Sequence, residues 1–215
     1  MTCTFRRLGG RRGVLTAAAT ACAVTGTTLI AVAFAPHTAP PPRPTTAERA
    51  STSETVPSRP PSRVPELPPS PPTRVVAPRV GLEVNVDPVE LDDDGSIALP
   101  RNVGHAGWFT GSLTPGQKGN TVLVGHVDSH DGPAAFYELG AVHKGDRVEV
   151  KRQDGRTVSY EVESISIWPQ DDFPSRRVYG PTPGPRLTLI TCTDWDAERR
   201  TYVSNLVVTA RPTTQ

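Results

Sequence analysis

The sequence predicts an all-β fold, a closed barrel or a sandwich, for the part of the chain that begins at residue 75. Short runs of β-branched and other apolar residues recur there, separated by glycine, proline, asparagine and aspartate. Many short strands with turn signals between them are typical of these two architectures. Helical periodicity is weak throughout, and only 132–139 ("GPAAFYEL") predicts a short helical turn, with Pro133 placed to start it.

The first 35 residues have the pattern of a membrane signal. Four arginines fall within residues 1–12, and residues 13–35 carry no charge. These 23 positions span about 34 Å as a helix, which is enough to cross a hydrocarbon core of about 30 Å. The arginines predict that residues 1–12 stay in the cytoplasm and that the rest of the chain lies outside. A cleavable signal peptide is the alternative, because 33–35 ("AFA") has the small-x-small form; the length of the run and Pro36 favour an uncleaved anchor.

Residues 36–74 predict a disordered linker. Thirteen of the 24 prolines lie between Pro36 and Pro72, among serine, threonine and scattered charges. Such a composition buries too little apolar surface to offset the entropy lost on ordering. The remaining residues, 75–215, suit one domain that needs no disulfides to bury a core.

Five strand-like segments follow in order within this domain. The segment 74–91 is broken by Pro78 and Pro88, as in short or edge strands. The segment 120–127 ("NTVLVGHV") is a short apolar strand. Residues 145–168 contain two alternating runs around Asp154-Gly155, a strong hairpin signal. The segments 186–192 and 201–210 close the chain as two further strands.

Charge and motif content exclude several classes of function. The formal net charge of +1 lacks the basic excess of a nucleic-acid-binding face. The sequence has no metal-ligand cluster, phosphate-binding glycine loop or dinucleotide motif, so we expect neither a metal nor an organic cofactor.

Cys192 is the one cysteine of the predicted exported domain, because Cys3 and Cys22 belong to the N-terminal segments. Exported domains normally use cysteines in pairs as disulfides. The unpaired thiol of Cys192 is therefore either a reactive group or a buried, inert small hydrophobe. A cysteine becomes a nucleophile when a neighbouring imidazolium or helix N-terminus stabilises its thiolate.

His126 is the best placed of the four histidines in the domain to serve that cysteine. It emerges where the apolar run "TVLVG" ends, and Gly125 before it permits an unusual backbone conformation. His130 and His143 sit in polar, turn-like sequence, and His105 has too little context to judge. Rims at strand ends are where a rigid scaffold presents catalytic groups.

An acyl-transfer nucleophile also needs a donor for the oxyanion. Arg199 and Arg200 lie on the turn before the last strand, seven and eight residues after Cys192. Arginine supplies a permanently charged fork of donors. Taken alone, both arginines are better explained as part of a solvated turn.

Together these residues resemble the sortases, above all the actinobacterial class F type. The likeness is carried by "TVLVGHVDS" with "GPAAF", by "LTLITC" after "YGPTPGP", and by a terminal "NLVVTA" strand, in the family's order and over roughly residues 76–211. The resemblance implies an eight-stranded β-barrel with short helical turns. It also implies a membrane-anchored cysteine transpeptidase that cleaves an LPxTG-like sorting signal.

The resemblance assigns roles residue by residue. Cys192 is the nucleophile that forms a thioester, and His126 is the general acid and base. Arg200 is the expected oxyanion donor and Arg199 the second choice. Many sortases carry arginine directly before the apolar run of the last strand, where this chain has Asn205, so a substitute role for Asn205 stays open.

The implied partners are sorting signals of exported proteins and an amine acceptor such as a cell-wall precursor. The implied location is the cell membrane, crossed once, with the catalytic domain extracellular. Two alternatives remain: a cysteine peptidase that releases its acyl group to water, and an inert exported β-domain with a binding role. The preferred motif, the acceptor amine and the choice between wall anchoring and pilus assembly do not follow from the sequence.

Overall fold

The structure, a computed structural model, describes residues 40–45, 48–49 and 66–213. The predicted cytoplasmic segment 1–12 and anchor 13–35 lie outside the described residues, as does most of the predicted linker. Among the residues that are described, no helix combines the length and apolar character needed to cross a membrane.

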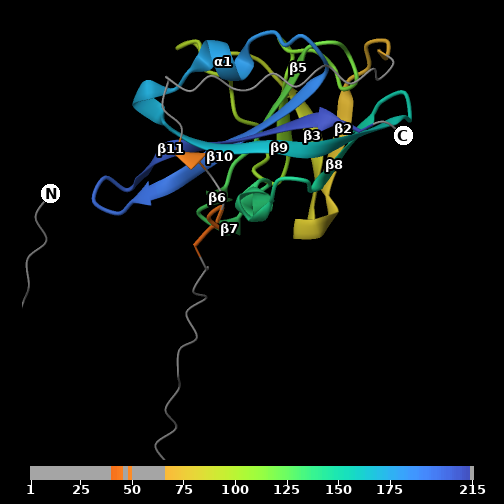
Figure 1. Cartoon of the computed structure of the whole chain (residues 1–215). Coiled ribbons are helices and arrows are strands. Elements are labelled where there is room, and N and C mark those ends of the chain that lie inside the picture. Colours follow the sequence, from red (N-terminus) through yellow and green to blue (C-terminus); the bar gives the residue numbers. More distant parts are fainter. Residues whose placement is uncertain (1–39, 46–47, 50–65, 214–215) are drawn as a thin grey trace, which may run out of the picture. The chain divides into compact units, whose positions relative to one another are not determined.

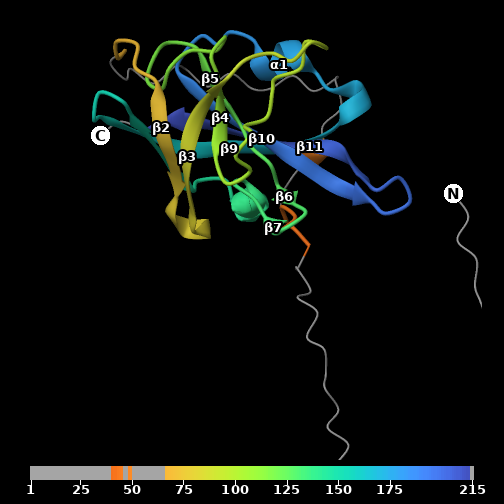
Figure 2. The ribbon, with the colours of Figure 1, turned by 180° about the vertical axis from the view of Figure 1, so that it is seen from behind.

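Eight strands of the described chain close into a barrel, which confirms the predicted all-β fold (Figures 1 and 2). Around the barrel the order is β9-β11-β10-β5-β4-β3-β2-β8, and β8 pairs with β9 to close it. A further short strand, β1, adds to β9 in parallel. The strands are β1 (Glu48–Arg49), β2 (Pro72–Ala77), β3 (Leu82–Val89), β4 (Ala106–Phe109), β5 (Asn120–Val124), β8 (Arg147–Arg152), β9 (Thr157–Pro169), β10 (Arg186–Asp196) and β11 (Thr201–Pro212).

Short elements complete the described fold. The hairpin β6 (Asp128–Ser129) and β7 (Gly132–Pro133) leads into the 3-10 turn η2 (Tyr137–Ala141). A second 3-10 turn, η1 (Pro78–Val80), joins β2 to β3. After β9 come η3 (Gln170–Asp172) and the one-turn helix α1 (Ser175–Tyr179). The few, short helices agree with the weak helical periodicity of the sequence.

The β8–β9 hairpin forms where the sequence predicts it. Antiparallel pairs run from Arg147 with Glu161 to Lys151 with Thr157, and the turn contains Gly155 at φ 82°. Glycine adopts this left-handed conformation without the steric cost that a Cβ brings.

Alternation along the strands divides the apolar residues between two faces. The interior of the barrel is filled by a main core that includes Leu123, Phe136, Tyr160, Leu189 and Leu206. Residues one position away on the same strands form a second cluster, because successive strand side chains point to opposite faces. We call it the outer apolar cluster; its buried members are Val89, Val122, Val124, Trp168, Val178, Ile190 and Val207. Helix α1 contributes Val178 to it.

The structure differs from the sequence-based expectation at several boundaries. Strand β2 begins at Pro72, three residues before the expected domain boundary at 75. Strand β4 and helix α1 were not expected as separate elements. The expected helical turn at 132–139 is displaced, because 132–133 pair as β7 and the 3-10 turn begins at Tyr137.

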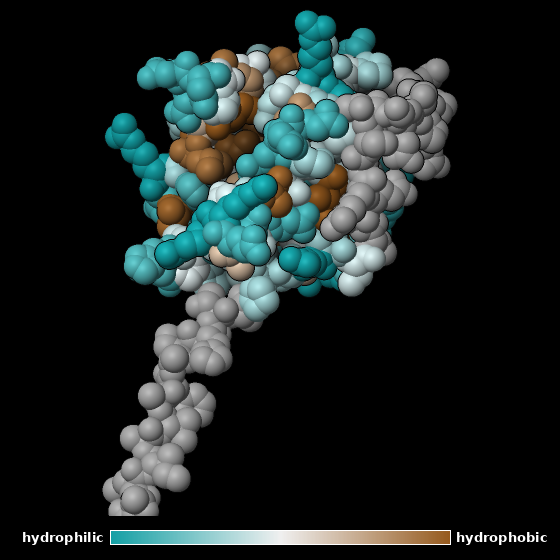
Figure 3. Space-filling model, turned by 90° about the vertical axis from the view of Figure 1, so that its left-hand side faces the viewer, coloured by the Kyte–Doolittle hydropathy of each residue, from teal (hydrophilic) through white to brown (hydrophobic). Residues whose placement is uncertain are grey.

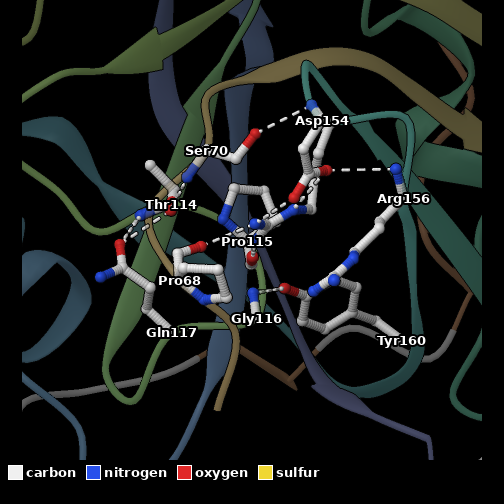
Figure 4. Close-up of polar contacts among 10 residues, drawn as sticks. Pro68, Ser70, Thr114, Pro115, Gly116, Gln117, Asp154, Arg156 and Tyr160 are labelled. Carbon is white, nitrogen blue, oxygen red and sulfur yellow. Dashed lines mark hydrogen bonds and ion pairs between the residues drawn. The ribbon is translucent and has the colours of Figure 1, made fainter.

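A buried arginine fastens the entry to the barrel. The side chain of Arg152 is fully buried and donates to the carbonyls of Pro115 and Pro68. Its Nη2 also donates to the carboxylate of Asp154 at 2.8 Å. The Ser70 hydroxyl accepts from the Asp154 backbone N–H at 3.1 Å (Figure 4). The segment before β2 is thereby joined both to the 114–117 loop and to the β8–β9 hairpin.

Candidate active site

The parallel pair of β5 and β10 brings together two segments that are far apart in sequence. Its register runs from Arg186 beside Asn120 to Ile190 beside Val124. Cys192 follows Ile190 by two residues, and His126 follows Val124 by two. Because the strands run in the same direction, both residues leave the pair at the same rim of the barrel. By alternation both also point to the face of the outer apolar cluster, to which Ile190 and Val124 belong.

Two hydrogen bonds continue the alignment beyond the last ladder pair. The Gly125 N–H donates to the Ile190 carbonyl at 3.1 Å, and the Thr191 hydroxyl donates to the Gly125 carbonyl at 2.8 Å. Thr191 is buried, so this second bond is shielded from water. The two residues that precede Cys192 are therefore both bonded directly to Gly125, the residue before His126.

Gly125 is required for a reason other than the expected unusual backbone conformation. It is not among the glycines with positive φ. A Cβ at this position would lie 2.8 Å from atoms of the Phe136 ring, which fills the barrel interior. The glycine therefore allows a core aromatic side chain to pack against the backbone immediately before His126.

His126 is half-buried and its ring is held from one side. Nε2 lies 3.2 Å from the carbonyl oxygen of Pro100. A carbonyl only accepts, so Nε2 carries the hydrogen in this arrangement and a neutral ring keeps Nδ1 as its proton acceptor. The backbone carbonyl of His126 accepts from the Phe136 N–H at 2.9 Å, which fixes the main chain as well.

Cys192 is a free, partly buried cysteine. Burial raises the pKa of its thiol above the ordinary value, and the negative charge of Asp128 raises that pKa further. Asp128 accepts a 2.5 Å hydrogen bond from the hydroxyl of Tyr202. Burial and this bond together raise the pKa of Tyr202. A raised pKa favours the thiol over the thiolate, and a cysteine in that form acts as a nucleophile only where a base takes its proton.

The structure does not bring Arg199 and Arg200 to this pair. Both lie on the turn that joins β10 to β11, and Arg199 pairs with Asp196 at 3.6 Å. Arg200 is exposed and has a φ of 54°. The turn begins beyond the pair Asp196–Thr201, four register steps from Cys192. At about 3.3 Å per residue those steps amount to roughly 13 Å.

Asn205 lies beside the cysteine instead. It is the register partner of Cys192 on β11 and is also the register partner of Trp168 on β9. A row of four neighbouring positions thus runs across β9, β11, β10 and the segment that follows β5: Trp168, Asn205, Cys192 and His126. The guanidinium of Arg177, on α1, lies 5.4 Å from the centroid of the Trp168 ring.

Sequence reasoning gave no role to Asp128, Tyr202, Trp168 or Arg177. Asp128 follows His126 by two residues, and that spacing was the available signal. The approach of Tyr202 depends on how the β10–β11 hairpin folds back, and no local pattern reports it.

A groove of about 830 Å³ lies between the end of β9 and the β10–β11 hairpin, and neither Cys192 nor His126 is among its lining residues. Gln170, Asp194, Trp195 and Tyr202 are among its lining residues, and Arg43 also lines it. Viewed from the hairpin side of the molecule, apolar residues gather in a recess bordered by hydrophilic ones (Figure 3). This side of the molecule therefore presents both polar and apolar side chains.

The comparison with protein-family models identifies the family of this chain. The family model of the sortase domain matches residues 75–213. The chain belongs to the sortase family. No curated protein sequence matches it significantly. Sortases are cysteine transpeptidases, so membership supports an enzyme of that class.

Solved sortase structures share the fold of this sortase domain at low sequence identity. Sortase A from Corynebacterium diphtheriae is 23% identical with a TM-score of 0.53, over 68% of this chain and 62% of that one. Sortase C-1 from Actinomyces oris is 24% identical with a TM-score of 0.51, over 66% and 73%. A pilus-related sortase C of Group B Streptococcus is 21% identical with a TM-score of 0.52, over 67% and 68%. These likenesses show the sortase barrel; the resemblance to class F stays a prediction.

Proposed function

We propose that this sortase is a membrane-anchored cysteine transpeptidase that cleaves an LPxTG-like sorting signal and transfers the acyl group to an amine. The observation that carries the proposal is the parallel register of β5 and β10, extended by the Thr191–Gly125 hydrogen bond. It supports the proposal because Cys192, the proposed nucleophile, and His126, the proposed proton acceptor, leave the β5–β10 pair at one rim and on one face. An inert core cysteine has no need of a histidine placed in this way.

The reaction divides into two acyl transfers through one thioester. As His126 takes the thiol proton, the sulfur of Cys192 bonds to the carbonyl carbon of the Thr–Gly peptide bond. The C–N bond then breaks while His126 returns the proton to the leaving amine, and the acyl group stays on sulfur. An incoming amine gives its proton to His126, bonds to the thioester carbon and releases the Cys192 thiol.

The outer apolar cluster supports a substrate with apolar residues before the scissile bond. Ile190 and Val124 directly precede the Cys192 and His126 positions on the same face, and Trp168 and Val207 continue the cluster. A leucine-proline pair next to the scissile threonine presents apolar surface that such a face can cover.

Location and partners are proposed on the sequence. The arginines before the uncharged run 13–35 support a single span with the barrel outside the cell. A sorting signal that is itself held at the membrane would then meet the tethered enzyme at a raised effective concentration. A cell-wall precursor amine is the proposed acceptor.

Incubation of the full chain in detergent with an LPxTG peptide and triglycine tests the proposal. A ligated product, seen by mass spectrometry, is expected from the wild type, and Cys192→Ala should yield none. His126→Ala should lose about 10²- to 10⁴-fold in rate, the usual contribution of general acid–base catalysis. His130→Ala removes an exposed histidine of the neighbouring loop and is the matched control.

The outcomes separate the alternatives. Cleaved peptide without ligated product, at any triglycine concentration, would support the hydrolytic peptidase. A wild type that neither cleaves nor ligates any peptide of a sorting-signal library would support the inert binding domain and reject the transpeptidase. The oxyanion donor assigned to Arg200 by resemblance is tested together with its rival below.

A further inference from the structure

We propose that Asn205 is a catalytic residue of this sortase and that its side-chain amide donates the hydrogen bond that stabilises the oxyanion. The inference deepens the proposed function, on which it rests. It assigns the donor role to a neutral amide on the strand next to the nucleophile, and not to a guanidinium on the hairpin turn.

Register and alternation leave Asn205 as the side-chain donor beside Cys192 on β11. Residues that pair across antiparallel strands point to the same face, with Cβ atoms about 4.5–5.5 Å apart. The neighbours of Asn205 on that face of β11 are Val203 and Val207, neither of which can donate a hydrogen bond. Ser204 and Leu206 point to the opposite face, where Leu206 belongs to the main core.

The orientation of the amide suits donation towards β10. Gln170, which follows the end of β9, donates from Nε2 to the Asn205 Oδ1 at 3.4 Å. Strand β9 flanks β11 on the side opposite β10. An amide whose oxygen is held from the β9 side presents its NH₂ group to the β10 side, which is where Cys192 lies. Gln170 is accordingly a positioning residue.

The chemistry needs such a donor at both acyl transfers. When the sulfur bonds to the carbonyl carbon, the π-electron pair moves to the oxygen, which becomes the oxyanion of a tetrahedral intermediate. The pair returns to re-form the C=O bond as the C–N bond breaks. A donor 2.7–3.1 Å from the oxyanion stabilises this intermediate, and loss of one such donor costs about 10²- to 10³-fold in rate.

Two reactions of the same sulfur test the proposal on the full chain in detergent. Acylation by p-nitrophenyl acetate passes through an oxyanion and requires no sorting motif. Alkylation by iodoacetamide displaces iodide and forms no oxyanion. Asn205→Ala should slow acylation about 10²- to 10³-fold and leave alkylation unchanged. Asn205→Asp, of the same shape but unable to donate when ionised, should slow acylation further. Asn85→Ala, an exposed strand asparagine on β3, is the control.

Several outcomes would overturn the proposal. Acylation by Asn205→Ala at the wild-type rate is one, and an equal loss of acylation and alkylation is another, because the residue would then act on the thiol. A larger loss of acylation in Arg200→Ala than in Asn205→Ala would return the role to the arginine.

Gln170→Ala should lower kcat for acylation without changing alkylation, and Gln170→Glu, which keeps the shape but cannot donate, should not restore it.

These results are independent of the fate of the proposed function. If the wild type is acylated by the ester but ligates no sorting peptide, the transpeptidase proposal fails and the Asn205 comparison still gives its answer. Retained alkylation and an unchanged melting temperature identify a variant that is folded.

Discussion

We predict that loss of the hydrogen bond from Thr191 to the Gly125 carbonyl lowers both the stability of the domain and its activity. Thr191→Val keeps the side-chain shape and removes the hydroxyl, which leaves a buried carbonyl without this partner. Such a loss costs about 1–3 kcal/mol. For a domain of this size the melting temperature falls by about 2–4 °C per kcal/mol.

The same strand offers a matched control. Thr188 is buried as well, and its hydroxyl donates to the Asn120 Oδ1 at 2.8 Å, at the end of the β5–β10 pair that is remote from Cys192. Thr188→Val should therefore destabilise the barrel by a similar amount. Only Thr191→Val loosens the link between the segments that carry Cys192 and His126. Because misplacement by about 1 Å can cost about 10²-fold in rate, it should lose 10- to 100-fold in kcat/KM for acyl transfer.

Melting curves and initial acylation rates of the two variants, measured side by side, check this reasoning. The expected result is two similar melting temperatures and one large loss of activity. Equal activity of the two variants, whether both high or both low, would show that the Thr191–Gly125 bond does not align Cys192 with His126.

Two further predictions concern charge. Asp128→Asn removes the negative charge that raises the pKa of Cys192, so that pKa should fall and the midpoint of the alkylation rate against pH should move to lower pH. Asp131→Asn, in the same loop, is the control and should leave the midpoint in place. An unmoved or raised midpoint in Asp128→Asn would contradict the effect assigned to the Asp128 charge. Arg152→Met leaves two loop carbonyls without their buried cationic donor and should cost about 3 kcal/mol in the free energy of unfolding, measured by urea denaturation. The exposed Arg156→Met is its control, expected within about 0.5 kcal/mol of the wild type, and equal losses would refute the role of the buried network.

Local patterns predicted the strands of the barrel well because their signals are short-range. The hairpin at Asp154-Gly155 formed as expected, since its turn residues and alternating runs act over a few positions. Strand β4, with four residues, is too short to show a period. Helix α1 has a single turn, and its one buried residue, Val178, packs on a surface that only the folded barrel creates.

The candidate site was predictable in part for the same reason. His126 follows the end of β5, which the apolar run before it reports directly. Cys192 was expected at the end of a strand over 186–192, but β10 continues past it to Asp196. Which donor faces the sulfur depends on register between β10 and β11, and a shift of one residue would turn Asn205 to the barrel interior. The resemblance to the sortases, in which an arginine is the donor, favoured Arg200, but the hairpin carries it away from the sulfur as β10 extends to Asp196.

The topology explains why two residues 66 positions apart meet at this rim. Most pairs in the barrel are antiparallel, and the ends of antiparallel partners leave a sheet in opposite directions. The β5–β10 pair is parallel, so the residues after Val124 and after Ile190 emerge together. Antiparallel β11 then returns past the same point and places Asn205 opposite Cys192. One parallel and one antiparallel neighbour thus flank Cys192 with His126 on one side and Asn205 on the other, the proposed base and the proposed oxyanion donor. Both positions are fixed by backbone hydrogen bonds and not by long, flexible side chains.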